Sequence, residues 1–239
     1  MNIVIVNQHT CNRGDEAAGR AVIESLLNEF PYSKISVLYR FHGIFPPIDC
    51  NSERVKHYPE YKYNKKHLVQ FYLEIGWNFL LGILRQKKGF IGNSGKLYKK
   101  IANADIVVNA PTGPNIGDIY KDKFYIMNLL FAVLAGKKTF MYGSSVGPFN
   151  TPWLKKWSEF LFERMSIICV REDVSLGYLK DLNLKNKNIY SSLDAAVQRE
   201  INTEKAIEYY NNAGFNLNKY NVGITPLAFP WYPKEIREE

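Results

Sequence analysis

The sequence of 239 residues has few cysteines and no leader-like segment, and these absences narrow the class of protein. Cys11, Cys50 and Cys169 form no CxxC pair, which argues against a disulfide framework and against a structural zinc site. Residues 1–7 contain no basic region and reach polar residues too soon for a signal peptide. We therefore expect a reduced, cytoplasmic protein that binds no metal.

The sequence also contains no internal repeat and no low-complexity tract, so neither a solenoid nor a disordered chain is expected. Excess charge is absent from most of the chain. Positions 51–100 hold eleven Lys and Arg against three acids, and this block carries the whole net charge of +8. Basic charge confined to one region indicates one anionic contact surface rather than nucleic-acid binding.

Short apolar runs alternate with amphipathic stretches, a pattern typical of a parallel sheet with crossover helices. The predicted strands are Ile3–Asn7, Ile35–Tyr39, Ala104–Asn109, Lys138–Tyr142, Ser166–Arg171, Asn188–Ser191 and Val222–Pro226. The predicted helices are Asp15–Phe30, Lys123–Ala135, Pro152–Met165, Asp173–Asp181 and Thr203–Ala213. The pattern predicts an α/β fold with a Rossmann-like, doubly wound, mostly parallel sheet.

Residues 41–103 interrupt this alternation. Phe41–Asn64 is predicted to be irregular, because Pro and polar residues cluster there. His67–Leu84 is almost continuously apolar, but Glu74 and other polar residues make it a poor transmembrane span, and it is slightly short. Two interpretations stay open. It is a helix buried between other elements, or residues 65–88 form an in-plane helix with basic flanks on anionic headgroups at the inner face of the membrane.

The candidate sites are the turns after the predicted strands, because ligands of an open parallel sheet bind there. The first turn, Asn12-Arg13-Gly14-Asp15-Glu16, combines a Gly that permits close backbone approach with an Arg suited to phosphate or carboxylate. In a purely structural interpretation Asp15 only caps the next helix. The turn matches neither GxGxxG nor a Walker loop, so NAD and ATP are not expected.

Two further turns are rich in Gly. Residues 109–120 contain two Gly, one of them Gly113, and two Pro, which impose a specific backbone path. Asp118 in this turn either orients a sugar hydroxyl and accepts its proton, or caps the helix that follows. The turn G-S-S-V-G-P-F offers Ser144 and Ser145 as donors, and it fits the GxSxG string of hydrolases. Every histidine precedes these serines, so the hydrolase order has no base.

The fourth turn places a basic side chain at the end of a strand. In V-R-E-D-V-S, Arg171 ends the strand and Asp173 is predicted to cap the helix that follows. A strand-end arginine at the edge of the sheet is suited to anchoring an anion. Asp194 ends a later strand in the same way.

Five collinear motifs together resemble the polysaccharide pyruvyl transferase family. They are N-R-G-D-E-A-A at 12–18, P-T-G-P-N-I-G-D-I-Y at 111–120, G-S-S-V-G-P-F at 143–149, V-R-E-D-V-S at 170–175 and L-D-A-A-V at 193–197. The resemblance spans roughly residues 3 to 229. It implies transfer of a pyruvyl group from phosphoenolpyruvate to a sugar of a surface polysaccharide, forming a ketal. No cofactor is implied beyond this donor substrate.

The resemblance also implies roles for individual residues. The resemblance assigns Arg171 to the binding of the anionic donor. Asp15 and Asp118 are instead proposed from the acid–base chemistry of the reaction, as the candidate catalytic residues that position the acceptor. The other predicted substrate-binding residues are Asn12, Arg13, Gly14, Gly113, Ser144 and Ser145; Arg13 is included for its turn chemistry rather than for the family. The family places its site between two Rossmann-like domains, as in two-domain glycosyltransferases of the GT-B kind.

The sequence departs from the family in two respects. Thr112 stands where the family more often has Gly. The family usually has a second domain with a basic residue and a catalytic His, whereas no His follows His67. We therefore predict an amino-terminal domain at 1–220 and the start of a truncated second domain at 221–239, with an incomplete active site. Two alternatives remain: a sugar-nucleotide glycosyltransferase domain, and an inactive membrane-associated scaffold.

Overall fold

The computed structural model comprises two compact units, Met1–Gln198 and Arg199–Glu239. The residues that the structure describes are 1–9, 13–40, 48, 50, 52–59, 68–113, 115–120, 122–198, 202–215 and 219. In the second unit they form the helix α7 (Thr203–Asn212), which Asn202 caps by accepting a hydrogen bond from the Lys205 N–H. The predicted domain boundary at residue 220 and the predicted strand Val222–Pro226 lie outside the described residues.

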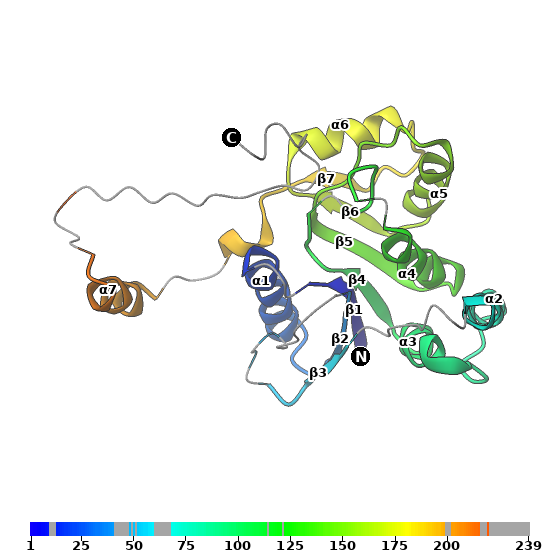
Figure 1. Ribbon diagram of the computed structural model, residues 1–239, viewed down its shortest axis with the longest axis horizontal. Coiled ribbons are helices and arrows are strands. Elements are labelled where there is room, and N and C mark those ends of the chain that lie inside the picture. The colour runs from blue at the N-terminus through cyan, green and yellow to red at the C-terminus, as the bar shows by residue number, and fades with distance from the viewer. Residues whose placement is uncertain are drawn as a thin grey trace. The chain divides into compact units, whose positions relative to one another are not determined.

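The first unit is built on a seven-stranded parallel sheet with the order β3-β2-β1-β4-β5-β6-β7 (Figure 1). Its strands are β1 (Asn2–Gln8), β2 (Lys34–Tyr39), β3 (Val55–Tyr58), β4 (Ile106–Asn109), β5 (Lys138–Ser144), β6 (Ile167–Val170) and β7 (Ile189–Ser191). Its helices are α1 (Arg13–Glu29), α2 (Leu68–Ile83), α3 (Gly92–Ala102), α4 (Lys123–Leu134), α5 (Pro152–Phe162), α6 (Asp173–Asp181) and the 3-10 helix η2 (Ala195–Gln198). The predicted Rossmann-like α/β fold is confirmed.

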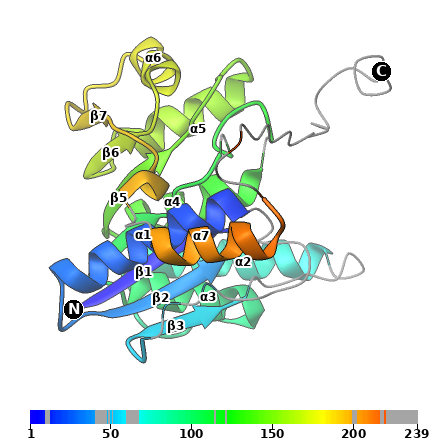
Figure 2. The same ribbon diagram turned by 90° about the vertical axis from the view of Figure 1, so that its left-hand side faces the viewer.

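Alternation along β1 builds a core on each side of the sheet. Ile3 and Ile5 pack in the cluster that includes the buried face of α1, and Val4 and Val6 pack in the cluster that includes α4. Figures 1 and 2 show α1 on one face of the sheet and α2 to α5 on the other. Because both faces are covered, the strands are apolar along most of their length.

The order in which strands are added to the sheet reverses between β1 and β4. From β1 it moves outward through β2 to β3, and it then returns through α2 and α3 to add β4 on the other side of β1. Open parallel sheets bind their ligands at the carboxyl ends of the strands, at the point where the strand order reverses, and here that point lies between β1 and β4. The topology therefore directs attention to the residues after β1, β4 and β5.

The structure corrects several predicted elements. Helix α1 begins at Arg13, so Asp15 lies in its first turn and is not the cap; likewise Glu172, not Asp173, occupies the cap position of α6. The edge strand β3 and the helix α3 were not predicted. Strand β3 is short and carries Lys and His, and α3 begins with Gly-Asn-Ser-Gly, so neither has the usual apolar or helix-forming signal.

Candidate functional site

A chain of buried amides joins the carboxyl ends of the central strands. Asn7 Nδ2 donates to Asn109 Oδ1 at 2.9 Å, and Asn128 Nδ2 on α4 donates to Asn7 Oδ1 at 2.9 Å. Asn109 Nδ2 donates to Ser144 Oγ at 3.0 Å, and Ser144 Oγ donates to the Ala110 carbonyl at 3.1 Å. All these side chains are buried, so the network fixes β1, β4, β5 and α4 relative to one another. Ser144, a predicted substrate-binding residue, is a member of this network.

The two Gly-rich turns pack against each other through their backbones. Ile116 and Val146 form a parallel bridge, the Gly147 N–H donates to the Ile116 carbonyl at 2.8 Å, and the Ser145 N–H donates to the Thr112 carbonyl at 3.1 Å. A Cβ on Gly117 would overlap the Gly147 backbone. The motif glycines thus permit a close backbone approach, which explains why the two turns need so specific a path.

Gly113 differs from Gly117, because a Cβ at Gly113 would meet no heavy atom within 4 Å. The described residues therefore leave open space beside this predicted substrate-binding position. Space next to the backbone at the carboxyl edge of the sheet is compatible with a ligand there. A structural reason for Gly, such as a positive φ or a close contact, is not seen at this position.

Asp118 holds a loop that follows β5. Its carboxylate accepts hydrogen bonds from the Asn150 N–H, the Thr151 N–H and the Thr151 hydroxyl, and its own N–H donates to the Pro148 carbonyl at 2.8 Å. These contacts satisfy backbone groups just before α5 begins at Pro152. Asp122, and not Asp118, caps the helix that follows, by accepting from the Phe124 N–H at 2.9 Å. The geometry gives Asp118 a loop-positioning role.

Arg171 lies among acidic partners at the end of β6. Its Nη1 donates to Asp194 Oδ2 at 2.7 Å, and its Nε donates to Ser145 Oγ at 2.8 Å and to Glu172 Oε2 at 3.1 Å. Ser145 Oγ in turn donates to Glu172 Oε2 at 3.0 Å. Ser175 completes the motif by accepting a hydrogen bond from the Val146 N–H at 2.9 Å. Among the described residues, Arg171 therefore faces two carboxylates, Glu172 and Asp194.

Asp15 is the titratable group with the most informative environment in this region. Burial raises the pKa of Asp15 to about 6, with Arg171 acting against the rise and Asp194 adding to it. Burial also raises the pKa of the Tyr120 phenol, and the nearby Asp15 carboxylate raises it further. Asp15 therefore lies close enough to Arg171, Asp194 and Tyr120 to interact electrostatically with each. A carboxyl group whose pKa is near neutrality can both accept and release a proton.

Two aromatic residues that were not predicted complete this region. Tyr125, near the start of α4, is hydrogen-bonded through its hydroxyl to His9 Nε2, and the two ring centroids are 5.4 Å apart. Burial raises the pKa of Tyr125 well above its ordinary value, and the carboxylates of Asp122 and Asp15 raise it further. Thr112 makes a side-chain hydrogen bond to the same hydroxyl. His9 directly follows β1, where the strand order reverses. This position after the first strand was the only sequence signal from which His9 could have been predicted as a site residue.

A buried ion pair supports the same edge. Arg40 directly follows β2, and its Nη2 lies 3.0 Å from Asp122 Oδ2. The Arg40 guanidinium also stacks 4.8 Å from the centroid of the Phe124 ring. The side chain of Arg40 is buried, and Asp122 caps α4, so this pair ties β2 to the start of that helix.

The opening turn is only partly described. Asn12 lies outside the described residues. Arg13 and Gly14 start α1, and the side chain of Arg13 is 88% exposed and contacts Glu16 Oε2 at 2.5 Å. An exposed pair of this kind holds its partners weakly, so a competing anion could displace Glu16. The amino terminus of α1 adds the positive end of a helix dipole beside Arg13.

Among the described residues, no group of three or more His, Cys, Asp or Glu could hold a metal ion. None of the helices in this part of the chain is long and apolar enough to cross a membrane.

The fold and the carboxyl-edge cluster define an α/β protein with a candidate proton-transfer group at the change of strand order. A family model described as Polysaccharide pyruvyl transferase matches residues 12–234. The chain belongs to this family.

A curated relative is the Amylovoran biosynthesis protein AmsJ of Erwinia amylovora. It is 26% identical over 204 residues, which cover 82% of this chain and 48% of that protein. The chain therefore spans about half the length of this relative.

Two solved structures are loosely similar. A functionally uncharacterized protein of Klebsiella pneumoniae has a TM-score of 0.43 and 14% identity, with 84% of this chain and 53% of that chain covered. The Bordetella bronchiseptica enzyme WbmH in complex with NAD+ has a TM-score of 0.30 and 11% identity, with 92% and 83% covered. Similarity at this level transfers no binding site.

Proposed function

We propose that this chain takes part in the transfer of a pyruvyl group from phosphoenolpyruvate to a saccharide of a surface polysaccharide, with Asp15 as the proton-transfer group. Membership of the polysaccharide pyruvyl transferase family supports the reaction class. The observation that carries the role of Asp15 is its half-buried position at the carboxyl edge of the sheet, near Arg171, Asp194 and Tyr120, where burial raises its pKa to about 6. A base with a pKa near the working pH suits removal of a proton from a sugar hydroxyl.

The proposed chemistry balances without a cofactor. One sugar hydroxyl loses its proton to Asp15 and its oxygen bonds to C2 of phosphoenolpyruvate. Asp15 then passes this proton to the methylene carbon, which becomes a methyl group. A second hydroxyl oxygen then bonds to C2, the C2–O bond to phosphate breaks, and the second hydroxyl proton leaves with the phosphate. The products are a cyclic ketal and inorganic phosphate.

We assign the donor and the acceptor to different parts of the edge. Arg171 already faces Glu172 and Asp194, so a phosphate there would meet two carboxylates at close range. Arg13 is exposed beside the start of α1, so the donor anion is better placed there. In this proposal Arg171 is a positioning residue for Asp194 and Asp15.

The remaining predicted residues take supporting roles in the proposal. The acceptor sugar would use the open space at Gly113. Ser145 would hold Arg171 in place, because its oxygen accepts from Arg171 Nε and donates to Glu172. Ser144 and Asp118 would hold the strand ends and the loop before α5, because their polar atoms are occupied by hydrogen bonds within the protein. Neither would touch the reacting atoms.

The test is release of inorganic phosphate by a full-length version of the protein incubated with phosphoenolpyruvate and a saccharide acceptor, with parallel thermal melts of the chain with each ligand. We expect thermal protection by phosphoenolpyruvate that is lost in Arg13→Gln and retained in Arg171→Gln. The opposite result would indicate that Arg171, and not Arg13, binds the donor anion. Protection by a UDP-sugar and none by phosphoenolpyruvate would contradict pyruvyl transfer and favour a sugar-nucleotide glycosyltransferase.

A further inference from the structure

Helix α2 is apolar on two faces, and only one of them is covered by the described residues. Phe71, Ile75 and Leu81 are buried, and Asn78 on the same side is hydrogen-bonded to the backbone of Ile91 at 3.0 Å. The outer face carries apolar residues at intervals of three and four: Val69, Tyr72, Leu73, Trp77, Leu80 and Ile83. Helical geometry places these six residues in one stripe.

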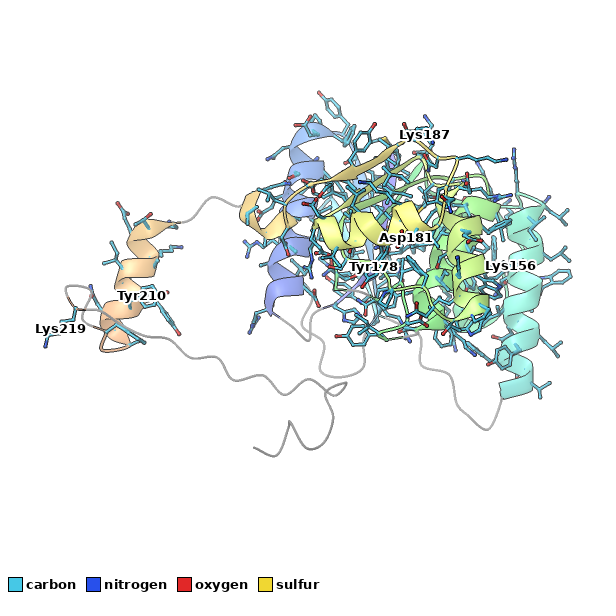
Figure 3. The ribbon with its side chains drawn as sticks, turned by 90° about the horizontal axis from the view of Figure 1, so that it is seen from above. Lys156, Tyr178, Asp181, Lys187, Tyr210 and Lys219 are labelled. Atoms are coloured by element: carbon cyan, nitrogen blue, oxygen red, sulfur yellow. The ribbon has the colours of Figure 1, made fainter. Side chains whose placement is uncertain are left out.

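The exposure of this stripe is unusual for a water-facing helix. Val69 and Leu73 are 75% and 69% exposed, and Gly76, which falls within the stripe, faces open space. Figure 3 shows α2 along one edge of the sheet unit, with side chains on its outer side pointing away from the other helices. A contiguous apolar surface of this kind marks an interaction site more often than ordinary protein surface.

Helix α5 extends the apolar surface beyond α2. A cavity of about 460 Å³ lies between the two helices, with Ile75 and Phe79 from α2, Met127 and Leu130 from α4, and Trp157 and Phe160 from α5 in its walls. Trp153 packs edge-on against Trp157, with ring centroids 6.0 Å apart. Three of the four tryptophans of the chain therefore lie on this surface, which we call the α2–α5 face.

Basic side chains border the α2–α5 face. Arg85, Lys87 and Lys88 follow the end of α2, and α5 contributes Lys155 and Lys156, the latter beside the cavity (Figure 3). Lys123 lies 5.8 Å from the Trp153 ring centroid, and Arg164 lies 3.6 Å from that of Phe160. The acids on the two helices and at the end of α5 are Glu74, Glu159 and Glu163. Positive charge therefore predominates around the apolar surface.

We propose that the α2–α5 face docks on an anionic lipid membrane. An apolar stripe with Trp and Tyr at its surface is suited to the boundary between headgroups and acyl chains, and flanking Lys and Arg are attracted to anionic headgroups. The charge distribution favours a membrane over a second copy of the chain. In a symmetric dimer through this face, each basic border would meet another basic surface.

The test is co-sedimentation of the chain with vesicles of phosphatidylcholine alone and with vesicles that also contain phosphatidylglycerol, at low salt. We expect binding to the anionic vesicles and a blue shift of the tryptophan emission when they are added. The double variant L73E/L80E should weaken binding by roughly tenfold or more, because two charges would enter the apolar boundary. Val174→Glu on α6, where Val174 is 65% exposed, is the control and should bind like the wild type.

A second pair of variants tests the electrostatic part separately. Lys155→Gln and Lys156→Gln should each weaken binding to anionic vesicles by roughly fivefold and leave circular dichroism unchanged. Absence of vesicle binding at low salt would overturn the proposal, and so would equal loss in Val174→Glu and in L73E/L80E. A concentration-dependent dimer that L73E/L80E abolishes, without vesicle binding by the wild type, would instead assign the α2–α5 face to a second copy.

Discussion

The carboxyl edge of the sheet and the α2–α5 face are built in opposite ways. At the edge, almost every side chain discussed is polar and engaged: Asn7 with Asn109, Asp118 with the loop before α5, and Arg171 with Asp194. On the α2–α5 face the exposed side chains are mostly apolar, and Val69 and Leu73 are more than two-thirds exposed. Hydrogen bonds within the protein fix the geometry of the carboxyl edge, whereas the α2–α5 face leaves apolar surface exposed.

This difference explains why the two regions have different sequence signals. The edge depends on particular atoms at fixed separations, so it appears as short motifs with Gly, Asn, Asp and Arg. The α2–α5 face depends on apolar area and bordering charge, so it appears as composition and helical spacing. The following substitutions test whether the two regions differ in this way.

The largest effect is expected from Asp15→Asn at the edge. Loss of the proton-transfer group should lower the rate of phosphate release on the order of 100- to 10,000-fold, with little change in the amount of folded protein. The check is steady-state phosphate release with and without the saccharide acceptor. A rate within about threefold of the wild type would remove Asp15 from the proposed chemistry.

The same variant should change stability in a pH-dependent way. Folding raises the pKa of Asp15 from its ordinary 3.8 to about 6, so the folded chain binds this proton more tightly than the unfolded chain does. The wild type therefore loses stability as pH rises through this interval, whereas the variant, whose amide cannot ionise, does not. The variant should gain about 3 kcal/mol relative to the wild type between about pH 3.5 and pH 7. Urea unfolding at several pH values measures it, and a pH-independent difference would contradict the raised pKa.

Next in size is a matched pair of glycine substitutions in one loop. Gly117→Ala should lower the free energy of unfolding by about 1–3 kcal/mol, because the new Cβ overlaps the Gly147 backbone. Gly113→Ala should leave stability within about 0.5 kcal/mol, because that position faces open space. Urea unfolding of both variants is the measurement. Equal stability losses would show that the two turns do not pack as described.

Arg171→Gln is expected to have a smaller effect on the rate. The measurement is the pH dependence of phosphate release. The Arg171 guanidinium lowers the pKa of Asp15, so its removal should raise that pKa and move the acidic limb of the rate profile to higher pH. A positioning role predicts this shift together with a lower kcat and little change in the KM for phosphoenolpyruvate. A raised KM with an unmoved acidic limb would favour direct anion binding by Arg171.

The smallest effect is expected on the α2–α5 face. Gly76→Ala should stabilise the chain by about 0.5–1 kcal/mol, because Ala has the higher helix propensity and the position faces open space. The measurement is the midpoint of urea unfolding in the absence of lipid. Destabilisation would mean that Gly76 is covered, and it would weaken the description of this stripe as exposed.

The sequence predicted much of the fold because buried parallel strands have a strong local signal. Continuous apolar runs such as Ile3–Asn7 marked the central strands, and the predicted α6 has the observed bounds. The edge strand β3 was missed because Val-Lys-His-Tyr has no continuous apolar run and gains its stability from pairing with β2. Helix α3 was missed because Gly92 and Gly95 have low helix propensity, and the helix depends on tertiary packing for its formation.

The candidate site was less predictable, because its groups interact across the sheet. The motifs marked Asp15 and Arg171, but the raised pKa of Asp15 depends on burial and on Asp194, which is distant in sequence. The pairing of His9 with Tyr125 joins residues 116 positions apart. The burial of Ser144 and the loop contacts of Asp118 also follow from neighbours that no local pattern specifies.

The buried amide chain through Asn7 has a consequence for local unfolding. Asn7 accepts from Asn128 on α4 and donates to Asn109 on β4, so separating either element breaks hydrogen bonds in a site shielded from water. The ends of β1, β4 and β5 should therefore open together with the start of α4 as one cooperative unit. In native-state hydrogen exchange, the amides of these segments would share one opening free energy, and Asn7→Ala would lower it for all of them at once.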